Sequence, residues 1–121
     1  MTAEAAEITI EHETDGGFTV VRPAGKLDTL SARTFEAYLK GLADANAGPL
    51  LIDMEKVDYV TSFGLRSLLI IAKLLAPSGG KLVLFQVNPS VIEVLKISGF
   101  LKILTVTDTL ASAKELAGQP R

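Results

Sequence analysis

The chain has 121 residues, of which 48% are hydrophobic and 21% are charged, a composition typical of one globular domain with a single core. Its 12 basic and 14 acidic residues give a formal charge of −2, so charge gives no reason to expect a nucleic acid partner. The chain contains no cysteine, which excludes disulfides, thiolate nucleophiles and zinc knuckles.

The first predicted elements are two strands joined by a tight turn. Apolar and polar residues alternate over residues 8–12, which is the period of a half-buried strand. The segment Asp15-Gly16-Gly17 favours a turn, and residues 18–23 have the composition of a second strand. The sequence therefore predicts a hairpin.

A helix is predicted after the segment Gly25-Lys26-Leu27-Asp28. Either Thr29 or Ser31 can cap its start. Its apolar residues recur at helical spacing; they are Phe35, Tyr38, Leu39 and Leu42. The helix should end before Gly48-Pro49, because glycine and proline commonly follow a helix.

The next two elements are a strand over residues 50–54 and a helix over residues 63–76. The strand should be covered on both faces, because its run is apolar except for Asp53. At about 100° per residue, one side of the helix forms a broad core stripe. We expect this stripe to contain Leu65, Leu68, Leu69, Ala72, Leu75 and Ala76. Ser62 comes just before the helix, where unpaired amides and the helix dipole favour a capping group or an anion.

The opposite side of this helix is also partly apolar. It carries the apolar residues Phe63, Ile70 and Leu74 beside the polar residues Arg66, Ser67 and Lys73. An exposed apolar group flanked by cations predicts a docking surface for a protein partner. Two alternatives stay open: these residues pack under a neighbouring helix or loop, or they form a weak homodimer contact.

The rest of the chain alternates between strands and helices. The predicted elements are a strand over 81–87, a helix over 90–97, a strand over 103–106 and a helix capped by Asp108 or Thr109 that runs to about residue 117. Ser90 and Glu93 have the spacing of a capping box, and Gly99 fits a left-handed helix end. We expect residues 1–6 and 118–121 to fray.

These elements predict one α/β domain over residues 1–121, with a mixed sheet of about five strands and about four helices. Parallel strands place their carboxyl ends at the same edge of a sheet, where α/β proteins usually have their sites. Several residues that follow strands should therefore gather at this edge. These are Asp28, Ser62, Asn88 and Asp108.

The sequence contains no catalytic or metal-binding pattern. His12 is the sole histidine and is far in sequence from any Ser–Asp pair, so a catalytic triad is not expected. Histidines and carboxylates do not cluster as metal ligands do. Ser78-Gly79-Gly80-Lys81 lacks the spacing of a phosphate-binding loop. We therefore expect no enzyme, no metal and no cofactor.

The chain begins without the basic and apolar regions of a signal peptide. Its longest apolar run is shorter than the roughly 20 residues that span a bilayer. We therefore expect a cytoplasmic protein that does not contact a membrane.

Asp28 has two interpretations. It can be a turn or cap residue before the first helix. It can also orient the Ser62 hydroxyl, or contact a nucleotide-bearing partner at the same sheet edge.

An ordered set of motifs resembles the STAS domain. The motifs are Gly25-Lys26-Leu27-Asp28, the apolar strand at 50–54, Val57-Asp58-Tyr59-Val60-Thr61-Ser62-Phe63-Gly64-Leu65, Gly79-Gly80-Lys81 and Ile97-Ser98-Gly99-Phe100. They cover almost the whole chain in order. More narrowly, the chain resembles single-domain bacterial anti-sigma factor antagonists, also called anti-anti-sigma factors.

This resemblance implies a sheet with helices mainly on one side, and a phosphorylatable serine at the start of the second helix, which matches Ser62. It also implies two partners: an anti-sigma factor that is a serine kinase of the GHKL type, and a PP2C-type phosphatase. Asp28 matches a position near the phosphoacceptor and the kinase interface. Two residues depart from the family pattern. Thr61 replaces a common aspartate and is an alternative phosphorylation site, and Phe63 replaces a small residue.

The leading hypothesis is an anti-sigma factor antagonist that binds the kinase, releases a sigma factor, and is switched off by phosphorylation at Ser62. Its predicted partner-binding residues are Asp28, Thr61, Ser62, Phe63, Arg66, Ser67, Ile70 and Leu74. The alternative is a constitutive STAS scaffold or subunit of a transporter or signalling complex, in which Ser62 is only a helix cap. A small-molecule or nucleotide sensor is a third hypothesis.

Overall fold

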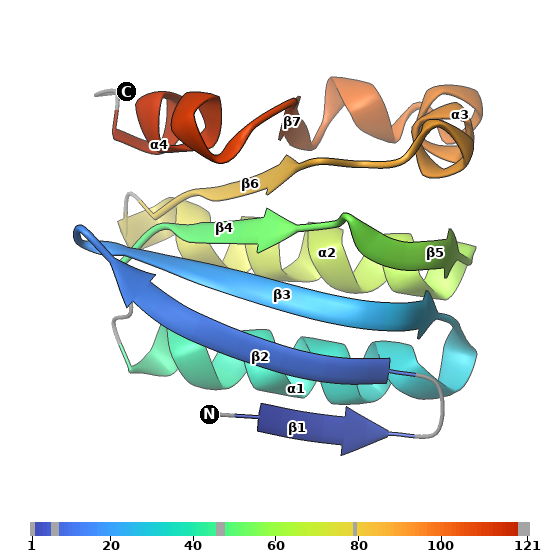
Figure 1. Cartoon of the computed structure of the whole chain (residues 1–121), viewed down its shortest axis with the longest axis horizontal. Coiled ribbons are helices and arrows are strands. Elements are labelled where there is room, and N and C mark those ends of the chain that lie inside the picture. Colours follow the sequence, from blue (N-terminus) through green and yellow to red (C-terminus); the bar gives the residue numbers. More distant parts are fainter. Residues whose placement is uncertain (1, 6–7, 46–47, 79, 119–121) are drawn as a thin grey trace.

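The computed structural model describes residues 2–5, 8–45, 48–78 and 80–118 (Figure 1). The strands are β1 (Thr2–Ala5), β2 (Ile8–Asp15), β3 (Phe18–Leu27), β4 (Leu50–Asp53), β5 (Lys56–Val60), β6 (Leu82–Phe85) and β7 (Thr105–Thr107). The α-helices are α1 (Thr29–Asp44), α2 (Ser62–Leu75), α3 (Pro89–Ser98) and α4 (Leu110–Gly118). Two 3₁₀ turns, η1 (Ala76–Ser78) and η2 (Phe100–Lys102), follow α2 and α3.

In the described part of the chain the strands form one mixed, seven-stranded sheet in the order β1-β2-β3-β4-β6-β7, with β5 paired to β3 beside this path. The pairs β1–β2 and β2–β3 are antiparallel. The pairs β3–β4, β3–β5, β4–β6 and β6–β7 are parallel. The mixed α/β sheet and the four α-helices are confirmed, and the strand count exceeds the predicted five because β1 and β5 were missed.

Both missed strands lack the usual sequence pattern of a strand. In β5 the buried residues Val57 and Val60 are three positions apart, because the pairing with β3 shifts register between Gly25 and Lys26. That spacing breaks the alternation that identifies a strand. Residues 2–5, predicted to fray, instead pair with β2 as β1. Residues 1, 6 and 119–121 of the predicted frayed ends lie outside the described residues, and Gly118 is the last residue of α4.

The predicted hairpin is confirmed. β2 and β3 pair from Ile8↔Gly25 to Asp15↔Phe18. Gly16 and Gly17 form the two-residue turn between them with φ angles of 60° and 88°. A two-residue turn of this hand requires positive φ at both positions, which glycine adopts without steric cost.

The sheet separates two apolar clusters. On one face, buried side chains of α1, α2 and α3 pack against the strands; among them are Phe35, Leu65 and Leu95. On the other face, Ala113 and Ala117 of α4 pack with apolar residues of β3, β4 and β6. Three of the four described α-helices therefore cover one face, in agreement with the predicted arrangement. Figure 1 shows α1 and α2 side by side behind the sheet.

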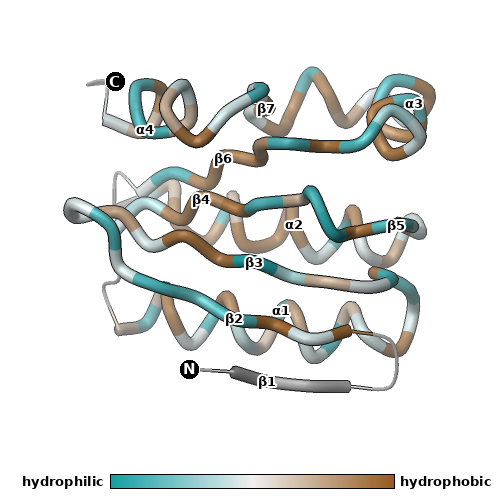
Figure 2. Tube along the Cα trace, viewed as in Figure 1, coloured by the Kyte–Doolittle hydropathy of each residue, from teal (hydrophilic) through white to brown (hydrophobic). Residues whose placement is uncertain are grey.

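Strand β4 contributes to both clusters, which explains its continuous apolar run. Leu50 and Ile52 belong to the cluster under α1 and α2, and Leu51 belongs to the cluster under α4. Because successive side chains of a strand point to opposite faces, a strand covered on both faces must be apolar throughout. Figure 2 shows the apolar stretch of β4 beside a shorter apolar stretch of β3.

The C-terminal helices start and end with recognisable capping residues. Asn88, and not Ser90, caps α3, because its side chain accepts a hydrogen bond from the Val91 N–H at 2.9 Å. The Ser90–Glu93 capping box was therefore a wrong prediction. Gly99 ends α3 with a φ of 80°, as predicted. At the start of α4, the Thr109 hydroxyl accepts from the Ser112 N–H at 3.1 Å, which selects Thr109 from the two predicted caps.

None of the helices in the described ranges is long and apolar enough to cross a membrane.

Candidate functional site

Thr61 is the capping residue of α2. Its hydroxyl oxygen accepts a hydrogen bond from the Gly64 N–H at 3.3 Å. The same hydroxyl donates to the Leu27 carbonyl at 3.4 Å, and the Thr61 N–H donates to that carbonyl at 3.0 Å. Thr61 therefore fixes the start of α2 to the end of β3.

Ser62 is the first residue of α2 and is not its cap. Its side chain is exposed. Within the described part of the chain, its hydroxyl makes no hydrogen bond. The interpretation of Ser62 as a helix cap is therefore wrong, because Thr61 occupies the cap position and accepts the hydrogen bond from the Gly64 amide. The arrangement leaves an exposed hydroxyl at the positive end of a helix dipole.

Asp28 caps α1. Its carboxylate accepts hydrogen bonds from the N–H groups of Leu30 and Ser31, each at 3.0 Å. The Asp28 N–H in turn donates to the Ser31 hydroxyl at 2.9 Å, which completes a capping box. The hydrogen bond from the Ser31 amide holds the pKa of Asp28 below its ordinary value. Neither predicted cap of α1, Thr29 or Ser31, occupies the cap position itself.

The carboxylate of Asp28 faces the amides of its own helix. In the described residues no hydrogen bond joins Asp28 to Ser62. The hypothesis that Asp28 orients the Ser62 hydroxyl therefore has no support from the geometry, and its capping interpretation is confirmed.

A close contact holds the starts of α1 and α2 together. Gly64 is buried in the first turn of α2, and a Cβ atom there would lie 2.6 Å from the Leu27 carbonyl oxygen. Leu27 directly precedes Asp28, and it pairs with Val60 in the parallel β3–β5 ladder. The predicted gathering of Asp28 and Ser62 at one sheet edge follows from this contact.

Asn88 joins the same edge, since its side-chain amide donates to the Val57 carbonyl of β5 at 2.7 Å. No hydrogen bond or ion pair in the described ranges connects Asp108 to these residues. Figure 1 shows α1 and α2 beginning at the arrowheads of β3 and β5.

The outward side of α2 is apolar and exposed, as predicted. The exposed fractions of Phe63, Ile70 and Leu74 are 53%, 39% and 44%. Arg66 and Lys73 are exposed beside them. Apolar side chains of this size that project together from one helix are characteristic of a protein interaction surface.

Ser67 is buried and not exposed on this surface, contrary to the prediction. It is 2% exposed, and its hydroxyl donates to the Gly64 carbonyl at 2.7 Å. The core stripe also differs from the predicted one: Gly64 and Ile71 are buried, whereas Leu69, Ala72 and Ala76 are only half-buried. The reason is that α2 packs against α1 as well as the sheet, so its buried side turns toward α1.

A shallow groove of about 260 Å³ lies between α1 and α2, and Phe63, the residue after Ser62, lines it. It is lined by Thr29, Ala32, Arg33 and Glu36 from α1 and by Phe63, Arg66, Ser67 and Ile70 from α2. The groove therefore combines an apolar wall with two guanidinium groups. Sequence reasoning placed only the α2 side of this groove, because the facing of α1 toward α2 depends on tertiary packing.

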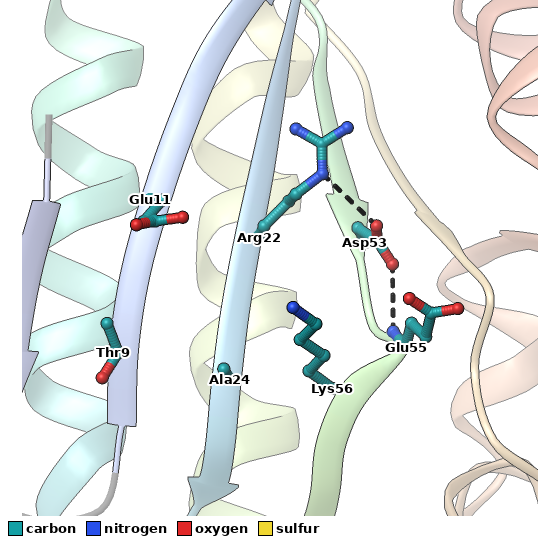
Figure 3. Close-up of a pocket in the computed structure, with 7 residues that line it drawn as sticks. All are labelled: Thr9, Glu11, Arg22, Ala24, Asp53, Glu55 and Lys56. Carbon is teal, nitrogen blue, oxygen red and sulfur yellow. Dashed lines mark hydrogen bonds and ion pairs between the residues drawn. The ribbon is translucent and has the colours of Figure 1, made fainter.

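A second hollow of about 390 Å³ lies on the sheet surface (Figure 3). Its lining residues are Thr9, Glu11, Arg22, Ala24, Asp53, Glu55 and Lys56. Arg22 pairs with Glu13 at 2.6 Å and with Asp53 at 3.5 Å. Asp53 also accepts a hydrogen bond from the Glu55 N–H at 3.0 Å, so the carboxylate that interrupts the apolar run of β4 is paired within the protein.

The remaining candidate chemistry is structural. His12 is hydrogen-bonded to the Tyr38 hydroxyl, and the two rings meet edge to face. Among the described residues, no group of three or more His, Cys, Asp or Glu side chains could hold a metal ion.

The amino-acid sequence is similar to a known domain family and to one of its members. The family model of the STAS domain matches residues 9–113. The chain is 35% identical over 97 residues to BtrV of Bordetella bronchiseptica, a candidate anti-sigma factor antagonist, covering 80% of this chain and 84% of BtrV.

Solved structures share the fold. A candidate anti-sigma factor antagonist from Thermotoga maritima superposes with a TM-score of 0.84 at 21% identity, covering 91% of this chain and 95% of that one. The phosphorylated form of SpoIIAA, a Bacillus cell fate determinant, superposes with a TM-score of 0.66 at 19% identity over 88% of this chain and 97% of that one. A murine anion transporter, Solute Carrier 26 family member A9, also matches, with a TM-score of 0.71 at 16% identity over 96% of this chain and 21% of the transporter.

Proposed function

The chain belongs to the STAS domain family, and from this premise we propose that it is an anti-sigma factor antagonist whose binding is switched off by phosphorylation at Ser62. The protein acts as one STAS domain in the cytoplasm and works by binding, not by catalysis. Its partner is an anti-sigma factor that is also a GHKL-type serine kinase. A PP2C-type phosphatase reverses the modification.

The observation that carries this proposal is the Ser62 hydroxyl. It is exposed, and it is not used to cap α2 because Thr61 has that role. It lies directly before Phe63, whose side chain is 53% exposed at the edge of the apolar surface. A kinase can reach this hydroxyl, and a group added to it changes the surface that the partner contacts.

The same geometry favours Ser62 over Thr61 as the phosphorylated residue. The Thr61 side chain is half-buried and its oxygen both accepts from Gly64 and donates to Leu27. Phosphorylation of Thr61 would break the cap of α2, whereas phosphorylation of Ser62 leaves every described hydrogen bond in place.

The proposed reaction transfers the γ-phosphoryl group of ATP to Ser62. A bond forms between the Ser62 oxygen and phosphorus, the bond from phosphorus to the ADP oxygen breaks, and the hydroxyl proton passes to a base of the kinase. The product carries about −1.5 to −2 charges. At the start of a helix this charge is tolerated by the free domain. In an apolar interface it must be desolvated, which opposes binding.

The energetic demand on the switch is moderate. Reversing a complex from 99:1 bound to 99:1 free takes about 5.5 kcal/mol of differential affinity. One negative group left without a matching cation in the buried interface can supply a penalty of this size.

The comparisons support the partner class. BtrV carries the designation of an anti-sigma factor antagonist, and SpoIIAA, which has the same fold, exists in a phosphorylated form. These properties belong to those two proteins. They indicate that binding to an anti-sigma factor and phosphorylation should be tested first in this chain.

The modification is tested by incubating the protein with its anti-sigma factor kinase and ATP and mapping phosphate by mass spectrometry. We expect phosphate on Ser62 and none on the Ser62→Ala variant. Ser90→Ala is a matched control, because Ser90 is also exposed in the first turn of a helix and its removal should leave phosphorylation unchanged. Phosphate on Thr61 or Ser90 in place of Ser62 would refute the assignment.

The switch is tested separately by measuring the affinity of Ser62→Asp for the same kinase by calorimetry. A strong loss of affinity is expected, whereas Ser90→Asp should bind like the parent. Undiminished binding by Ser62→Asp together with undiminished binding by the phosphorylated protein would exclude the switch.

A constitutive scaffold is the second candidate function. It is favoured by the fold match to a region of a murine anion transporter. In that case the Phe63–Ile70–Leu74 surface binds permanently and Ser62 has no regulatory role. Recovery of a transporter subunit in a pull-down, with no phosphate on Ser62, would support this alternative.

A further inference from the structure

Arg66 occupies a position from which it can reach both Ser62 and the interaction groove. It lies four residues after Ser62 on α2, and both side chains are exposed. Residues four apart on a helix are neighbours on its surface. Arg66 also lines the groove between α1 and α2, together with Phe63 and Ile70.

The side chains that line the groove carry more positive than negative charge. Arg33 of α1 and Arg66 of α2 both line it, and no ion pair in the described part of the chain includes either guanidinium group. Glu36 lines the groove as well, but no ion pair of the described residues joins it to either arginine. This local excess of cations contrasts with the formal charge of −2 for the whole chain.

A partner that covers Phe63 and Ile70 must also remove water from Arg66. A guanidinium group that loses water without gaining an acceptor is costly. The chemistry that fits this groove is therefore an apolar segment that carries a carboxylate, because a carboxylate matches the planar donor pattern of arginine.

We propose that the groove between α1 and α2 receives an apolar segment of the partner that carries a carboxylate, and that Arg66 leaves this carboxylate for the phosphate when Ser62 is phosphorylated. This inference rests on the proposed function, since it assigns the partner chemistry and the means of release at the same site. Arg66 is a positioning residue in this scheme: it takes no part in phosphoryl transfer.

Once Ser62 is phosphorylated, its phosphate competes with the partner's carboxylate for Arg66 and has the advantage. The phosphate carries more charge than a carboxylate and offers three acceptor oxygens. It is also attached to the same helix one turn away, so its pairing with Arg66 costs no association entropy. The partner's carboxylate is then left unpaired in an apolar contact, which weakens the complex in addition to the cost of burying the phosphate.

The intramolecular pair can be tested without any partner. Phosphoserine is incorporated genetically at position 62, and its second ionisation is followed by ³¹P NMR in the parent, in Arg66→Gln and in Lys73→Gln. Lys73 is a matched control, since it is an exposed cation of the same helix that does not line the groove. Arg66→Gln should raise the second pKa of the phosphoserine, because a neighbouring cation favours the dianion, and Lys73→Gln should shift it less. Titration curves of parent and Arg66→Gln that superimpose would overturn the pairing.

The partner chemistry is tested with the purified anti-sigma factor kinase in calorimetric titrations. Unmodified Arg66→Gln should bind about tenfold more weakly than the parent or worse, and phosphorylation should reduce its affinity by a smaller factor than it reduces the parent's. Lys73→Gln should lose less affinity than Arg66→Gln, and phosphorylation should reduce its affinity as strongly as it reduces the parent's. Equal affinities of parent and Arg66→Gln would overturn the groove assignment.

The two experiments separate this inference from the function on which it rests. If the kinase does not phosphorylate Ser62, the proposed switch fails, while the NMR titration of the incorporated phosphoserine still decides whether Arg66 binds the phosphate. If the kinase does phosphorylate Ser62 but Arg66→Gln behaves like the parent in both experiments, the switch stands and the role of Arg66 is refuted.

Discussion

Thr61 and Ser62 are adjacent hydroxyl residues with different tasks, and stability measurements can separate them. The Thr61 hydroxyl caps α2, whereas the Ser62 hydroxyl is exposed and without a hydrogen bond in the described chain. Thr61→Ala should lower the free energy of unfolding by about 0.5–2 kcal/mol, the usual cost of losing a cap. Ser62→Ala should change it by less than about 0.5 kcal/mol. Urea denaturation followed by circular dichroism measures both.

The comparison of these two variants is more informative than either alone. Thr61→Ser keeps a capping hydroxyl and should stay near the parent. A larger loss in Ser62→Ala than in Thr61→Ala would mean that Ser62 is the capping residue after all, and would weaken the case for a hydroxyl free to be phosphorylated.

Asp28 should make the stability of the protein sensitive to acid. Its folded-state pKa lies below the ordinary value of 3.8 because the Ser31 amide donates to its carboxylate. The charged form therefore favours the folded state above pH 3.8, and this contribution is lost as the pH falls through the lower, folded-state pKa. Asn can also cap a helix but does not titrate.

We therefore expect Asp28→Asn to lose less stability than the parent when the pH falls from about 5 to 2. Urea denaturation at a series of pH values measures the difference. Parallel stability curves for the two proteins would show that the capping carboxylate contributes nothing to the acid dependence.

The contact between α2 and the end of β3 depends on a single glycine. A Cβ atom at Gly64 would lie 2.6 Å from the Leu27 carbonyl oxygen and 2.7 Å from the Leu27 Cγ. Because the carbonyl belongs to the backbone, the start of α2 must move away from β3. Gly64→Ala should therefore lower the free energy of unfolding by about 1–3 kcal/mol, which thermal and urea denaturation can measure.

Gly41 is a matched control for this prediction. It lies within α1, and a Cβ atom added there would meet no neighbouring side chain or strand within 4 Å. Gly41→Ala should therefore raise stability by about 0.5–1 kcal/mol, because alanine favours a helix more than glycine does. If Gly64→Ala also stabilised the protein, the close packing of the two helix starts would be disproved.

The sequence predicted the elements that have a regular pattern. The hairpin was visible in its turn glycines, and the helix over 63–76 in its apolar period; both are observed within a few residues of their predicted ends. The motif order identified the family.

The features that the sequence did not predict depend on contacts between elements. Ser67 is buried because α1 packs beside α2. The position of Arg33 at the groove depends on the same packing.

The sequence also did not decide which of several side chains caps each helix. At the starts of α2 and α3, the residue considered as a cap lies one or two positions after the observed one, which is Thr61 or Asn88. At the start of α1, the observed cap, Asp28, was one of three candidates. Each start offers several side chains that can accept a hydrogen bond from an amide. The strand that precedes the helix decides among them, because it fixes where the extended backbone ends.

The arrangement of the whole sheet predicts that a modification at Ser62 would leave the fold intact. The larger apolar cluster lies under α1, α2 and α3, and the smaller one lies under α4 on the opposite face. Ser62 belongs to neither cluster, and it lies at the edge where β3 and β5 end. A negative charge at this edge meets the positive ends of helices, so the switch should act on the surface and not on the core.

This separation of surface from core gives a final prediction. Ser62→Asp and Ser90→Asp each add one negative charge in the first turn of a helix, α2 or α3. Each should raise the free energy of unfolding by about 0.3–1 kcal/mol at low ionic strength, with a smaller gain in high salt. Thermal denaturation at two salt concentrations measures the effect. If both variants are stabilised and only Ser62→Asp loses its partner, the loss of binding comes from the interface. If Ser62→Asp is destabilised, the charge acts through the fold, and release of the partner would have to be explained by unfolding of α2.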